Sequence, residues 1–430
     1  MGPYRRDIGK HGRRQAARRL ILPMTRRILR VIGLLAALCA TGALAQGRAQ
    51  TSAPARDALT IPFEPSIRHI LVKATVNHSR PLSFVLDTGA SVALVRTDVA
   101  RELGLQLGAP VKVGGAGPGT QSGYFVSGAT WSLVGLEDLA LPVNMALPLP
   151  ELPRALGRPV DGIIGGQFIR QFVVELDYQA RLMTLHDPAT FTYTGPGESI
   201  PIEFVSGSQP TISATVTATG GQPLTGRFLF DVGSGQALIL HSPFVTQHQL
   251  LRDDSHTIRP IGGAGAGGPP EGRLGRTESL RIGSFTLNRP ITMFSKDKAG
   301  AFANAALAGN IGAQVAMRFR LFLDYRNRCI IFEPAATYGE PFDRAFSGVA
   351  LRAYGDDYRT FRVIDVLERS PASAAGIKKD DVIMAIDGVP ADQLRLWMIN
   401  DMFERPNAYT VTILRGNRTL TVNLTPAKLI

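Results

Sequence analysis

The chain contains the same run of landmarks twice, and this duplication constrains its fold more than any other feature. The stretch KATVNHSRPLSFVLDTGASVALV, which includes Asp87, has a counterpart in SATVTATGGQPLTGRFLFDVGSGQALIL, which includes Asp231. The glycine-rich runs VGGAGPG and IGGAGAG follow in the same order, and the segments GIIGGQFIRQFVVELDY and GNIGAQVAMRFRLFLDY align without a gap. Positions 87 and 162 are 75 residues apart, and positions 231 and 309 are 78 apart. Three ordered landmarks at nearly equal spacing indicate two copies of one structural unit.

Each copy consists of short apolar runs separated by turn residues, a pattern typical of a mainly β fold that is closed or sandwiched. In the first copy we expect a hairpin formed by Ile70–Val76 and Leu82–Leu86. A short helix is expected over Thr97–Leu103, ended by Gly104. Further strands are predicted at Trp131–Val134, Met145–Pro148, Phe172–Leu176 and Arg181–Leu185.

The apolar run Phe84–Leu86 ends on the acid Asp87, followed at once by Thr88 and Gly89. A carboxylate at the end of a core strand is costly unless it is hydrogen-bonded. Asp and Gly are also common where any strand turns, so one copy of the motif does not distinguish a site from a turn. Its recurrence at Asp231 makes the two acids the leading candidates for a functional pair.

FVLDTGAS, followed later by GIIGGQF, resembles the retropepsin-like aspartic proteases, the retroviral and bacterial relatives of pepsin. The resemblance covers roughly Leu59–Pro341 and implies two tandem retropepsin-like β-barrel lobes that form a pepsin-like bilobal unit. It also implies that Asp87 and Asp231 are a catalytic pair sharing one proton, with a water held between them; one acts as base and the other as acid. Whether the two lobes pair within one chain or between chains stays open.

The same resemblance assigns residues that support the paired acids. They are Thr88, Gly89 and Ser91 in the first copy, and Gly233 and Ser234 in the second. Val232 departs from the family, which has Thr or Ser there. A valine side chain neither donates nor accepts a hydrogen bond, so the mutual brace between the two loops is incomplete. A buried hydrogen bond lost in this way costs about 1–3 kcal/mol.

The family also covers its cleft with a glycine-rich hairpin, the flap. We expect a flap at Gly114–Tyr124, with Gly114, Gly115 and Tyr124 as its marked residues, and a second at Gly262–Gly268, marked by Gly262 and Gly263. Glycine permits the bending that a closing lid requires. Tyr124 is open to a second interpretation, as a solvated hairpin residue. Both glycine runs lack the Lys-Ser/Thr ending and the following helix of a phosphate-binding loop.

The pattern changes after about Phe342. The run VIDVLERSPASAAGIKKDDVIMAIDGVPADQLRLWMINDMF resembles a bacterial PDZ domain, an α+β fold that binds extended peptides at a sheet edge. The resemblance implies a peptide loop at Phe346–Leu351 and a helix over Ala391–Phe403. The predicted groove residues are Gly348, Val349, Leu394 and Met398. The helical spacing of Leu394 and Met398 fits a core-facing stripe equally well, and the domain could instead simply pack against the lobes.

The N-terminus accounts for most of the net charge of +12. Residues 1–45 hold ten of the 47 Lys and Arg and one of the 35 acids, which leaves 37 and 34 for the rest. That balance excludes a basic stripe for nucleic acid. Arginines before the apolar run Val31–Leu38, with Ala43-Leu44-Ala45 after it, predict an export signal. We therefore expect an exported bacterial protein, periplasmic or secreted, or membrane-anchored where the signal stays uncleaved.

The remaining constellations are weak. The seven histidines show no metal spacing such as HExxH, and no Gly-x-Ser-x-Gly elbow is present, so neither a metal nor another cofactor is expected. Cys329 has no partner outside the predicted signal for a disulfide. The predicted boundaries are 1–45 for the extension and signal, 46–58 for a linker, 59–200 and 201–341 for the lobes, and 342–430 for the PDZ-like domain.

These observations lead to two functional hypotheses. The first is an exported aspartic endopeptidase that cleaves peptides or unfolded proteins and recognises a peptide through its PDZ domain. The second is an adaptor that grips peptides with degenerate lobes and a PDZ domain and does not cut them.

Overall fold

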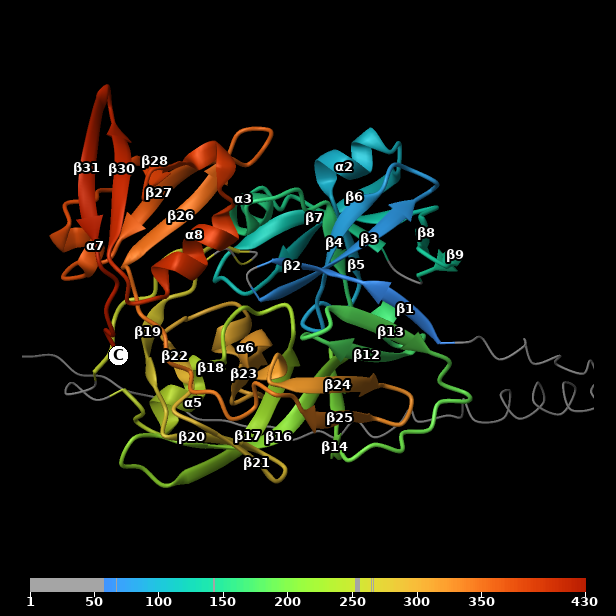
Figure 1. The fold of residues 1–430 in the computed structure, drawn as a ribbon. Helices are drawn as coiled ribbons and strands as arrows, with labels where there is room; N and C mark the ends of the chain where they lie inside the picture. Colours follow the sequence, from blue (N-terminus) through green and yellow to red (C-terminus); the bar gives the residue numbers. More distant parts are fainter. Residues whose placement is uncertain (1–57, 67, 142–143, 252–255, 264, 266) are drawn as a thin grey trace, which may run out of the picture. The chain divides into compact units, whose positions relative to one another are not determined.

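The computed structural model describes residues 58–430 except 67, 142–143, 252–255, 264 and 266. Within them the protein is mostly β, which confirms the predicted fold class (Figure 1). The predicted export signal and nearly all of the predicted linker lie outside the described residues. None of the described helices has the length and apolar character needed to cross a bilayer.

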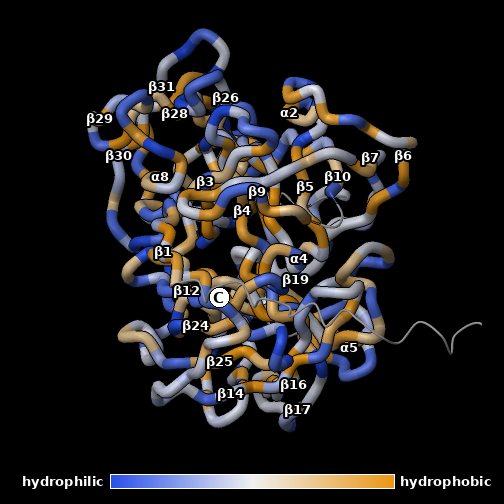
Figure 2. Tube along the Cα trace, turned by 90° about the vertical axis from the view of Figure 1, so that its right-hand side faces the viewer, coloured by the Kyte–Doolittle hydropathy of each residue, from blue (hydrophilic) through white to orange (hydrophobic). Residues whose placement is uncertain are grey.

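The first copy forms one sheet with the strand order β6-β7-β10-β5-β11-β4-β3-β8-β9, and β2 pairs with β3. We call this sheet and its helices the first lobe. Its strands are β2 Glu64–Ser66, β3 His69–Val76, β4 Leu82–Leu86, β5 Ala93–Arg96, β6 Gln106–Gly114, β7 Thr120–Ser127, β8 Thr130–Leu133, β9 Leu136–Ala140, β10 Asn144–Leu147 and β11 Gly162–Ile164. Its helices are α2 Thr97–Glu102, α3 Glu151–Leu156 and α4 Gly166–Ile169. The apolar strands β4 and β5 carry its core (Figure 2).

The second copy repeats this arrangement in the order β19-β22-β18-β23-β17-β16-β20-β21, with β15 on β16. We call it the second lobe. Its strands are β15 Glu203–Val205, β16 Gln209–Thr217, β17 Pro223–Asp231, β18 Leu238–Leu240, β19 Gly272–Arg276, β20 Ser279–Ile282, β21 Phe285–Asn288, β22 Ile291–Ser295 and β23 Gly309–Gly312. The helices are α5 Ser242–Gln247, η1 Ala301–Ala303 and α6 Ala313–Ala316. β11 runs parallel to β4 as β23 runs parallel to β17, so the sequence duplication is also structural.

A third sheet joins the two lobes within the single chain, in the order β1-β13-β12-β24-β25-β14. Its strands are β1 Leu59–Pro62, β12 Val173–Asp177, β13 Leu182–His186, β14 Glu198–Pro201, β24 Phe319–Asp324 and β25 Cys329–Pro334. The central pair is β12 with β24, antiparallel, with Val173 opposite Asp324 and Leu176 opposite Leu321. Because these strands come from opposite halves of the chain, the lobes pair within one molecule.

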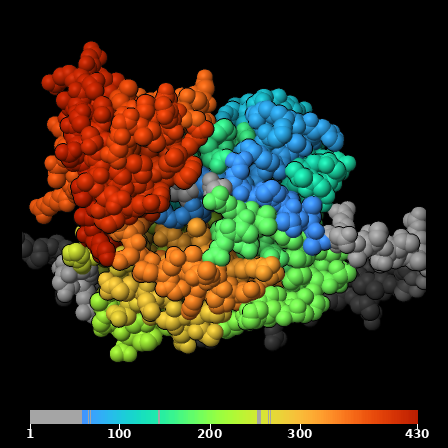
Figure 3. Space-filling view, in the orientation of Figure 1, coloured from blue at the N-terminus to red at the C-terminus, as the bar shows by residue number. Residues whose placement is uncertain are grey.

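The C-terminal domain has its own sheet, β26-β27-β28-β30-β31, with β29 on β28, and a separate hydrophobic core. Its strands are β26 Val349–Tyr354, β27 Thr360–Val366, β28 Val382–Ile386, β29 Val389–Pro390, β30 Tyr409–Arg415 and β31 Arg418–Leu424. Its helices are α7 Pro371–Ala374, η2 Ala391–Gln393 and α8 Leu396–Phe403. In the space-filling view this domain, coloured red, lies against both lobes (Figure 3).

The helix expected over Ala391–Phe403 is interrupted, which corrects the prediction. η2 ends at Gln393, Leu394 is extended with φ −96° and ψ 166°, and α8 begins at Leu396. The break turns Leu394 into the core of the domain, where it is buried. Apolar spacing alone could not reveal it, because buried residues on both sides of the break keep a helical period.

Candidate active site

The turns at the ends of β4 and β17, which occupy matching positions in the two copies, hold Asp87 and Asp231 in the same way. Asp87 follows β4 and Asp231 ends β17. The Asp87 Oδ1 atom accepts a hydrogen bond from Gly89 N at 2.7 Å, and Asp231 Oδ1 accepts one from Gly233 N at 3.1 Å. Backbone N–H donors thus hold one oxygen of each carboxyl group, and the second oxygen of Asp231 accepts from the Asn310 side chain.

The two turns meet face to face. A Cβ atom placed on Gly89 would lie 2.8 Å from Asp231 Cγ, and one placed on Gly233 would collide with Asp87 Cγ. Each glycine is therefore required because the opposite carboxyl group packs against its Cα. A hydrogen bond also links the Asp87 and Asp231 side chains directly.

The electrostatics of this aspartate pair are asymmetric. Burial raises the pKa of Asp87 well above its usual range, and the nearby charge of Asp231 raises it further. Burial also raises the pKa of Asp231, but hydrogen bonds from Asp87, Asn310 and Gly233 N oppose that rise. Asn310 donates a side-chain hydrogen bond to Asp231, which favours the carboxylate there and leaves the shared proton to Asp87. One acid beside one base is the arrangement that general acid–base hydrolysis needs.

Thr88 braces the two loops from one side. Its Oγ1 atom donates to Phe230 O at 2.6 Å and accepts from Val232 N at 2.9 Å, and its side chain is buried. Val232 is equally buried and supplies no hydroxyl in return. Half of the expected brace is therefore present, built on Thr88 alone.

Ser91 and Ser234 lie in the same two loops and contribute backbone carbonyls. Ser91 O accepts from Ser208 Oγ at 2.8 Å, and Ser234 O accepts from Ala313 N at 2.8 Å. Ser91 O also accepts from Gln167 N of α4 at 3.2 Å, so each loop is tied to the helix after β11 or β23, and the Ser208 bond ties the first loop to the second lobe.

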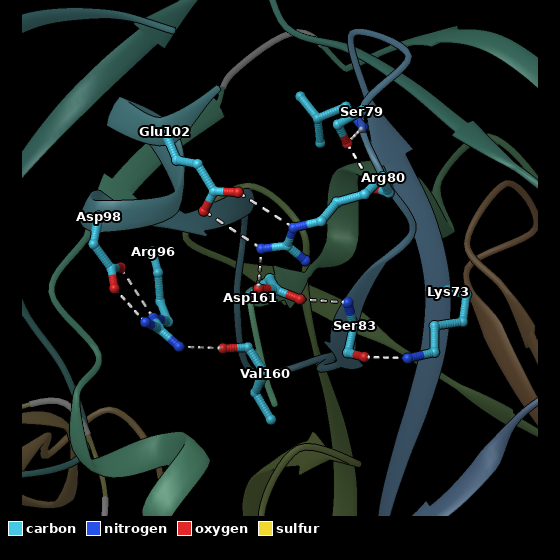
Figure 4. A network of polar contacts seen from close by, with 10 residues as sticks. Lys73, Ser79, Arg80, Ser83, Arg96, Asp98, Glu102, Val160 and Asp161 are labelled. Atoms are coloured by element: carbon cyan, nitrogen blue, oxygen red, sulfur yellow. Dashed lines mark hydrogen bonds and ion pairs between the residues drawn. The ribbon is translucent and has the colours of Figure 1, made fainter. Parts of the chain in front are cut away.

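A buried acid anchors the strand leading to Asp87. Asp161, just before β11, accepts a hydrogen bond from Ser83 N at 2.7 Å and lies 3.7 Å from the Arg80 guanidinium (Figure 4). Glu102 of α2 holds the other side of Arg80. In the second copy Ala308 stands at the position of Asp161, and only the backbone bond from Ala308 N to Arg227 O remains.

The predicted flap of the first copy is a hairpin of β6 and β7 with its tip at residues 115–119. Gly114 ends β6, and Tyr124 lies on β7 as a half-buried residue. The tip is tied to the second lobe, because Gly119 N donates to Gly267 O at 2.9 Å and Ala301 N donates to Gly115 O at 3.1 Å.

The described residues of the predicted second flap, 262–268, belong to no strand, although Ile258 and Leu274 on either side form an isolated antiparallel bridge. The role of this segment as a flap stays a prediction. Gly262, Gly267 and Gly268 have positive φ angles of 77°, 89° and 102°, and Pro269 and Pro270 that follow have no N–H to pair. Arg352 of β26 instead donates from Nη2 to Gly262 O at 2.7 Å and to Gly263 O at 3.0 Å.

The predicted peptide-groove residues are only partly brought together. Gly348 has a φ of 79° and accepts a hydrogen bond from Leu367 N at 2.7 Å, and Val349 begins the edge strand β26. Met398 lies half-buried on α8, whereas Leu394 lies ahead of that helix in the core.

β26 also contacts the lobes, because Arg352 pairs with Glu151 of α3 at 3.6 Å, and Arg154 of α3 lies over the Tyr354 ring. This packing is the alternative that the sequence left open.

Two residues near the acids were missed. Asn310 Nδ2 donates to Asp231 Oδ2 at 3.2 Å, and the buried His241 lies behind Asn310. No metal spacing includes His241, so the sequence pointed to no role for it. Comparing the two copies at matching positions marks both residues as departures, since Ile163 and Arg96 stand there in the first copy. No group of three metal-ligating side chains occurs in the described part of the chain.

Two family models match the sequence. Residues 72–168, within the first copy, match the family described as aspartyl protease, and residues 335–425 match the PDZ domain family. A curated protein from Synechocystis sp., named putative serine protease HhoA, is 40% identical over 68 residues. That match covers 16% of this chain, and the chain spans about a sixth (17%) of the relative's length.

Solved structures were also similar. An aspartic proteinase from Irpex lacteus is 12% identical, with a TM-score of 0.42 over 67% of this chain and 100% of that chain. The HtrA3 PDZ domain bound to a phage-derived ligand is 20% identical, with a TM-score of 0.18 over 20% of this chain and 85% of that chain.

Proposed function

We propose that this chain, which carries an aspartyl protease domain followed by a PDZ domain, is an aspartic endopeptidase that hydrolyses peptide bonds at Asp87 and Asp231. One observation carries the proposal. The two copies of the duplication bring two half-buried carboxyl groups into hydrogen-bond contact, each held by the N–H of its own loop glycine. A purely structural pair of turns has no need to place two half-buried acids side by side, because that arrangement disfavours ionisation of both.

The asymmetry of the pair assigns the roles. Asp231, as the carboxylate, takes a proton from a water molecule while the water oxygen attacks the peptide carbonyl carbon. Asp87, as the acid, gives its proton to the carbonyl oxygen, and a neutral tetrahedral diol results. Proton transfer to the amide nitrogen and return of a hydroxyl proton then break the C–N bond. The products are a carboxylic acid and an amine, and the pair regains its single proton.

The substrate class follows from the cover of the site. An extended peptide or an unfolded protein segment would lie under the β6–β7 hairpin, whose tip is bonded to Gly267 and Ala301 of the second lobe. Those two backbone hydrogen bonds must break before a substrate peptide can enter. The hairpin would then act as a lid that opens for binding and closes over the substrate. The PDZ domain would add recognition of a peptide strand or C-terminus. Export to the periplasm or beyond, from the predicted signal, belongs to the same proposal.

The name of the relative from Synechocystis sp. does not transfer to this chain. It is called a putative serine protease, but the match spans 17% of its length. The proposed chemistry therefore depends on the aspartate pair alone.

A non-catalytic peptide-binding adaptor is the second candidate, and Val232 favours it. The valine leaves the brace beneath the aspartate pair incomplete, as expected for a lobe in which precise placement of the acids no longer matters.

Cleavage of a denatured protein by the full chain distinguishes the two functions. We expect cleavage between about pH 3 and 8, with Asp87→Asn and Asp231→Asn each reducing it at least about a hundredfold. Asp401→Asn, at an exposed position on α8, is the matched control and should leave the rate unchanged. If nothing is cut, or if both active-site variants cut normally, the protein is not an aspartic protease.

A further inference from the structure

A chain of hydrogen bonds runs from Asp231 into the interior of the second lobe. Asn310 Nδ2 donates to Asp231 Oδ2 at 3.2 Å, and Asn310 Oδ1 lies 2.9 Å from His241 Nε2. The other ring nitrogen, His241 Nδ1, lies 3.1 Å from Asn304 O. Asn310 and His241 are both buried, so no bulk water competes for these contacts. We call this the Asp231–Asn310–His241 chain.

The chain exists in one copy of the duplication only. Ile163 stands where the second copy has Asn310, and Arg96 stands where it has His241, because Val95 and Leu240 are the partners of the matching Gly162 and Gly309. Ile163 offers no hydrogen bond to Asp87, and the Arg96 guanidinium pairs with Asp98 instead. Asn310 and His241 occur only in the second copy and contact each other. They therefore give Asp231 surroundings that Asp87 lacks, whereas an unchanged duplication would give both acids the same surroundings.

The orientation of the Asn310 amide fixes the protons on His241. With Nδ2 turned to Asp231, Oδ1 faces His241 Nε2, and a carbonyl oxygen only accepts. Nε2 must then donate. Nδ1 faces Asn304 O, which also only accepts, so Nδ1 must donate as well. An imidazole whose two nitrogens both donate carries both protons and a positive charge.

Rotating the amide by half a turn reverses every role. Nδ2 then donates to the bare Nε2 of a neutral His241, while Oδ1 faces Asp231 Oδ2. That contact is satisfied only when Asp231 carries a proton. One orientation therefore pairs an imidazolium with an Asp231 carboxylate, and the other pairs a neutral imidazole with an Asp231 carboxylic acid. A mixed state leaves a buried polar contact unmade, which is costly.

We propose that Asn310 and His241 are positioning residues that make Asp231 the ionised member of the aspartate pair, and that protonation of His241 holds Asn310 in the orientation that donates to Asp231. The proposal rests on the proposed function for its catalytic consequence. Its physical core, the linkage of His241 to Asp231 through one amide, does not depend on catalysis.

The charged and titratable groups around the chain set the pH range. His241 is affected most by burial, which lowers its pKa below the ordinary 6.5, while the contacts with Asn310 and Asn304 and the charge of Asp297 oppose this. Asp297 is itself held by Glu271 N and Ser295 Oγ. At the other end of the chain, Asp231 faces Asp87. The pKa of the buried Tyr325 is raised by its burial and, to a smaller extent, by the charges of both acids.

The sign of the pH effect follows. Below the pKa of His241 the imidazolium keeps Asn310 donating to Asp231, and the carboxylate form is stabilised. As pH rises through that pKa, the neutral ring can no longer donate from both nitrogens, so one of its two oxygen contacts is lost and the Asn310 amide is no longer held towards Asp231. Activity should therefore fall on the alkaline side at the pH where His241 titrates, below 6.5.

Removing the side-chain contacts of each residue in turn tests this, with Asn310 exchanged for its first-copy counterpart Ile and His241 for a residue without a ring. We expect Asn310→Ile and His241→Thr each to lower kcat/KM at pH 4–5 by roughly ten- to one-hundred-fold, the effect of one hydrogen bond to a charged group. The alkaline midpoint should move by more than about 0.5 unit, and the double variant should resemble the single ones because the residues act in series. Thr97→Val, at a buried position of the first lobe outside the Asp231–Asn310–His241 chain, is the control and should keep the native profile. Scaled profiles that superimpose on the native one would overturn the proposal.

Histidine proton NMR of the full chain provides a readout without catalysis. The His241 signal is identified by its absence in His241→Thr, and its titration is followed in the native protein and in Asp231→Asn. Removing the carboxylate takes away the partner of the imidazolium, so the His241 midpoint should fall by at least about 0.5 unit. An unchanged midpoint refutes the linkage even if the protein cleaves substrates. A shifted midpoint without any cleavage refutes the proposed function and keeps the linkage.

Discussion

The Thr88 hydroxyl and the backbone N–H of Val232 form a hydrogen bond of 2.9 Å between the two lobes, directly below the aspartate pair. The same hydroxyl donates to Phe230 O at 2.6 Å, so both of its hydrogen-bonding roles are used on the opposite loop. Val232 lies at the position that mirrors Thr88 and returns neither bond. The hydrogen bonds beneath the aspartate pair are thus made by the Thr88 side chain, and the Val232 side chain makes none in return.

Val232→Thr should strengthen these contacts between the lobes. A threonine has nearly the shape of valine, and the duplication places its hydroxyl where the first loop can accept and donate in the mirrored way. We expect the free energy of unfolding in urea to rise by about 0.5–1.5 kcal/mol, the net worth of a new buried hydrogen bond. Thr88→Val is the reciprocal variant and should lower it by about 1–3 kcal/mol, because Phe230 O and Val232 N lose their partner. A destabilised Val232→Thr would show that the mirrored contact does not form.

Asp161→Ala should weaken the first lobe more than any change at the matching place in the second. It leaves the buried Ser83 N–H without its acceptor and removes one carboxylate from Arg80. We expect a loss of about 1.5–3 kcal/mol in unfolding free energy, since the lost bond is to a charged group. Glu102→Gln is the control on the same arginine. Its pair with Arg80 is exposed and should be worth less than about 1 kcal/mol. Equal effects of the two variants would contradict this account.

The duplication explains why so much of the fold could be predicted. Short apolar runs bounded by turn residues mark β3, β4, β8, β10, β12 and β13 to within about two residues of the structure. The same alignment predicts that the loops of Asp87 and Asp231 are equivalent, and the structure brings them into contact. The catalytic role of that contact stays a proposal, as does the role of each supporting residue.

What the sequence could not show has physical causes. The sheet that joins the lobes pairs β12 with β24, about 150 residues apart in the chain, and local periodicity carries no information about such partners. The absence of strands from the described residues of 262–268 could not be predicted, because three of the glycines there adopt left-handed conformations that sequence spacing does not reveal. Asn310 was hidden because one amide within an apolar segment has no signature until its neighbour, His241, is known to lie behind it.

Arg352 should hold the PDZ domain to both lobes. Its buried guanidinium donates to Gly262 O and Gly263 O of the second lobe and pairs with Glu151 of the first. In Arg352→Met these acceptors lose their partner, and we expect faster proteolytic cleavage of the connection around Phe342 under native conditions, by roughly five- to tenfold. Lys379→Met removes an exposed cation from the same domain and should leave the cleavage rate unchanged. Identical rates for both variants would mean that Arg352 does not fasten the domain.

Glu175 should make the joint between the lobes sensitive to acid. Burial alone would raise the pKa of this β12 carboxylate, but hydrogen bonds from His186 Nε2 and Arg320 Nε, both at 2.8 Å, outweigh it and hold the pKa below the ordinary 4.5. A depressed carboxylate pKa contributes stability above 4.5, and that contribution is lost as pH falls through the lower, folded-state pKa.

We therefore expect Glu175→Gln to lower the unfolding free energy at pH 7 by about 1–2 kcal/mol, a value moderated because Arg320 is partly exposed. The difference from the native protein should shrink towards zero as pH falls to about 3, as measured by urea unfolding at each pH. Glu203→Gln removes an exposed pair with Arg227 and should change stability by less than about 1 kcal/mol at pH 7. A deficit in Glu175→Gln that persists at pH 3 would point to lost packing instead of a lost charge.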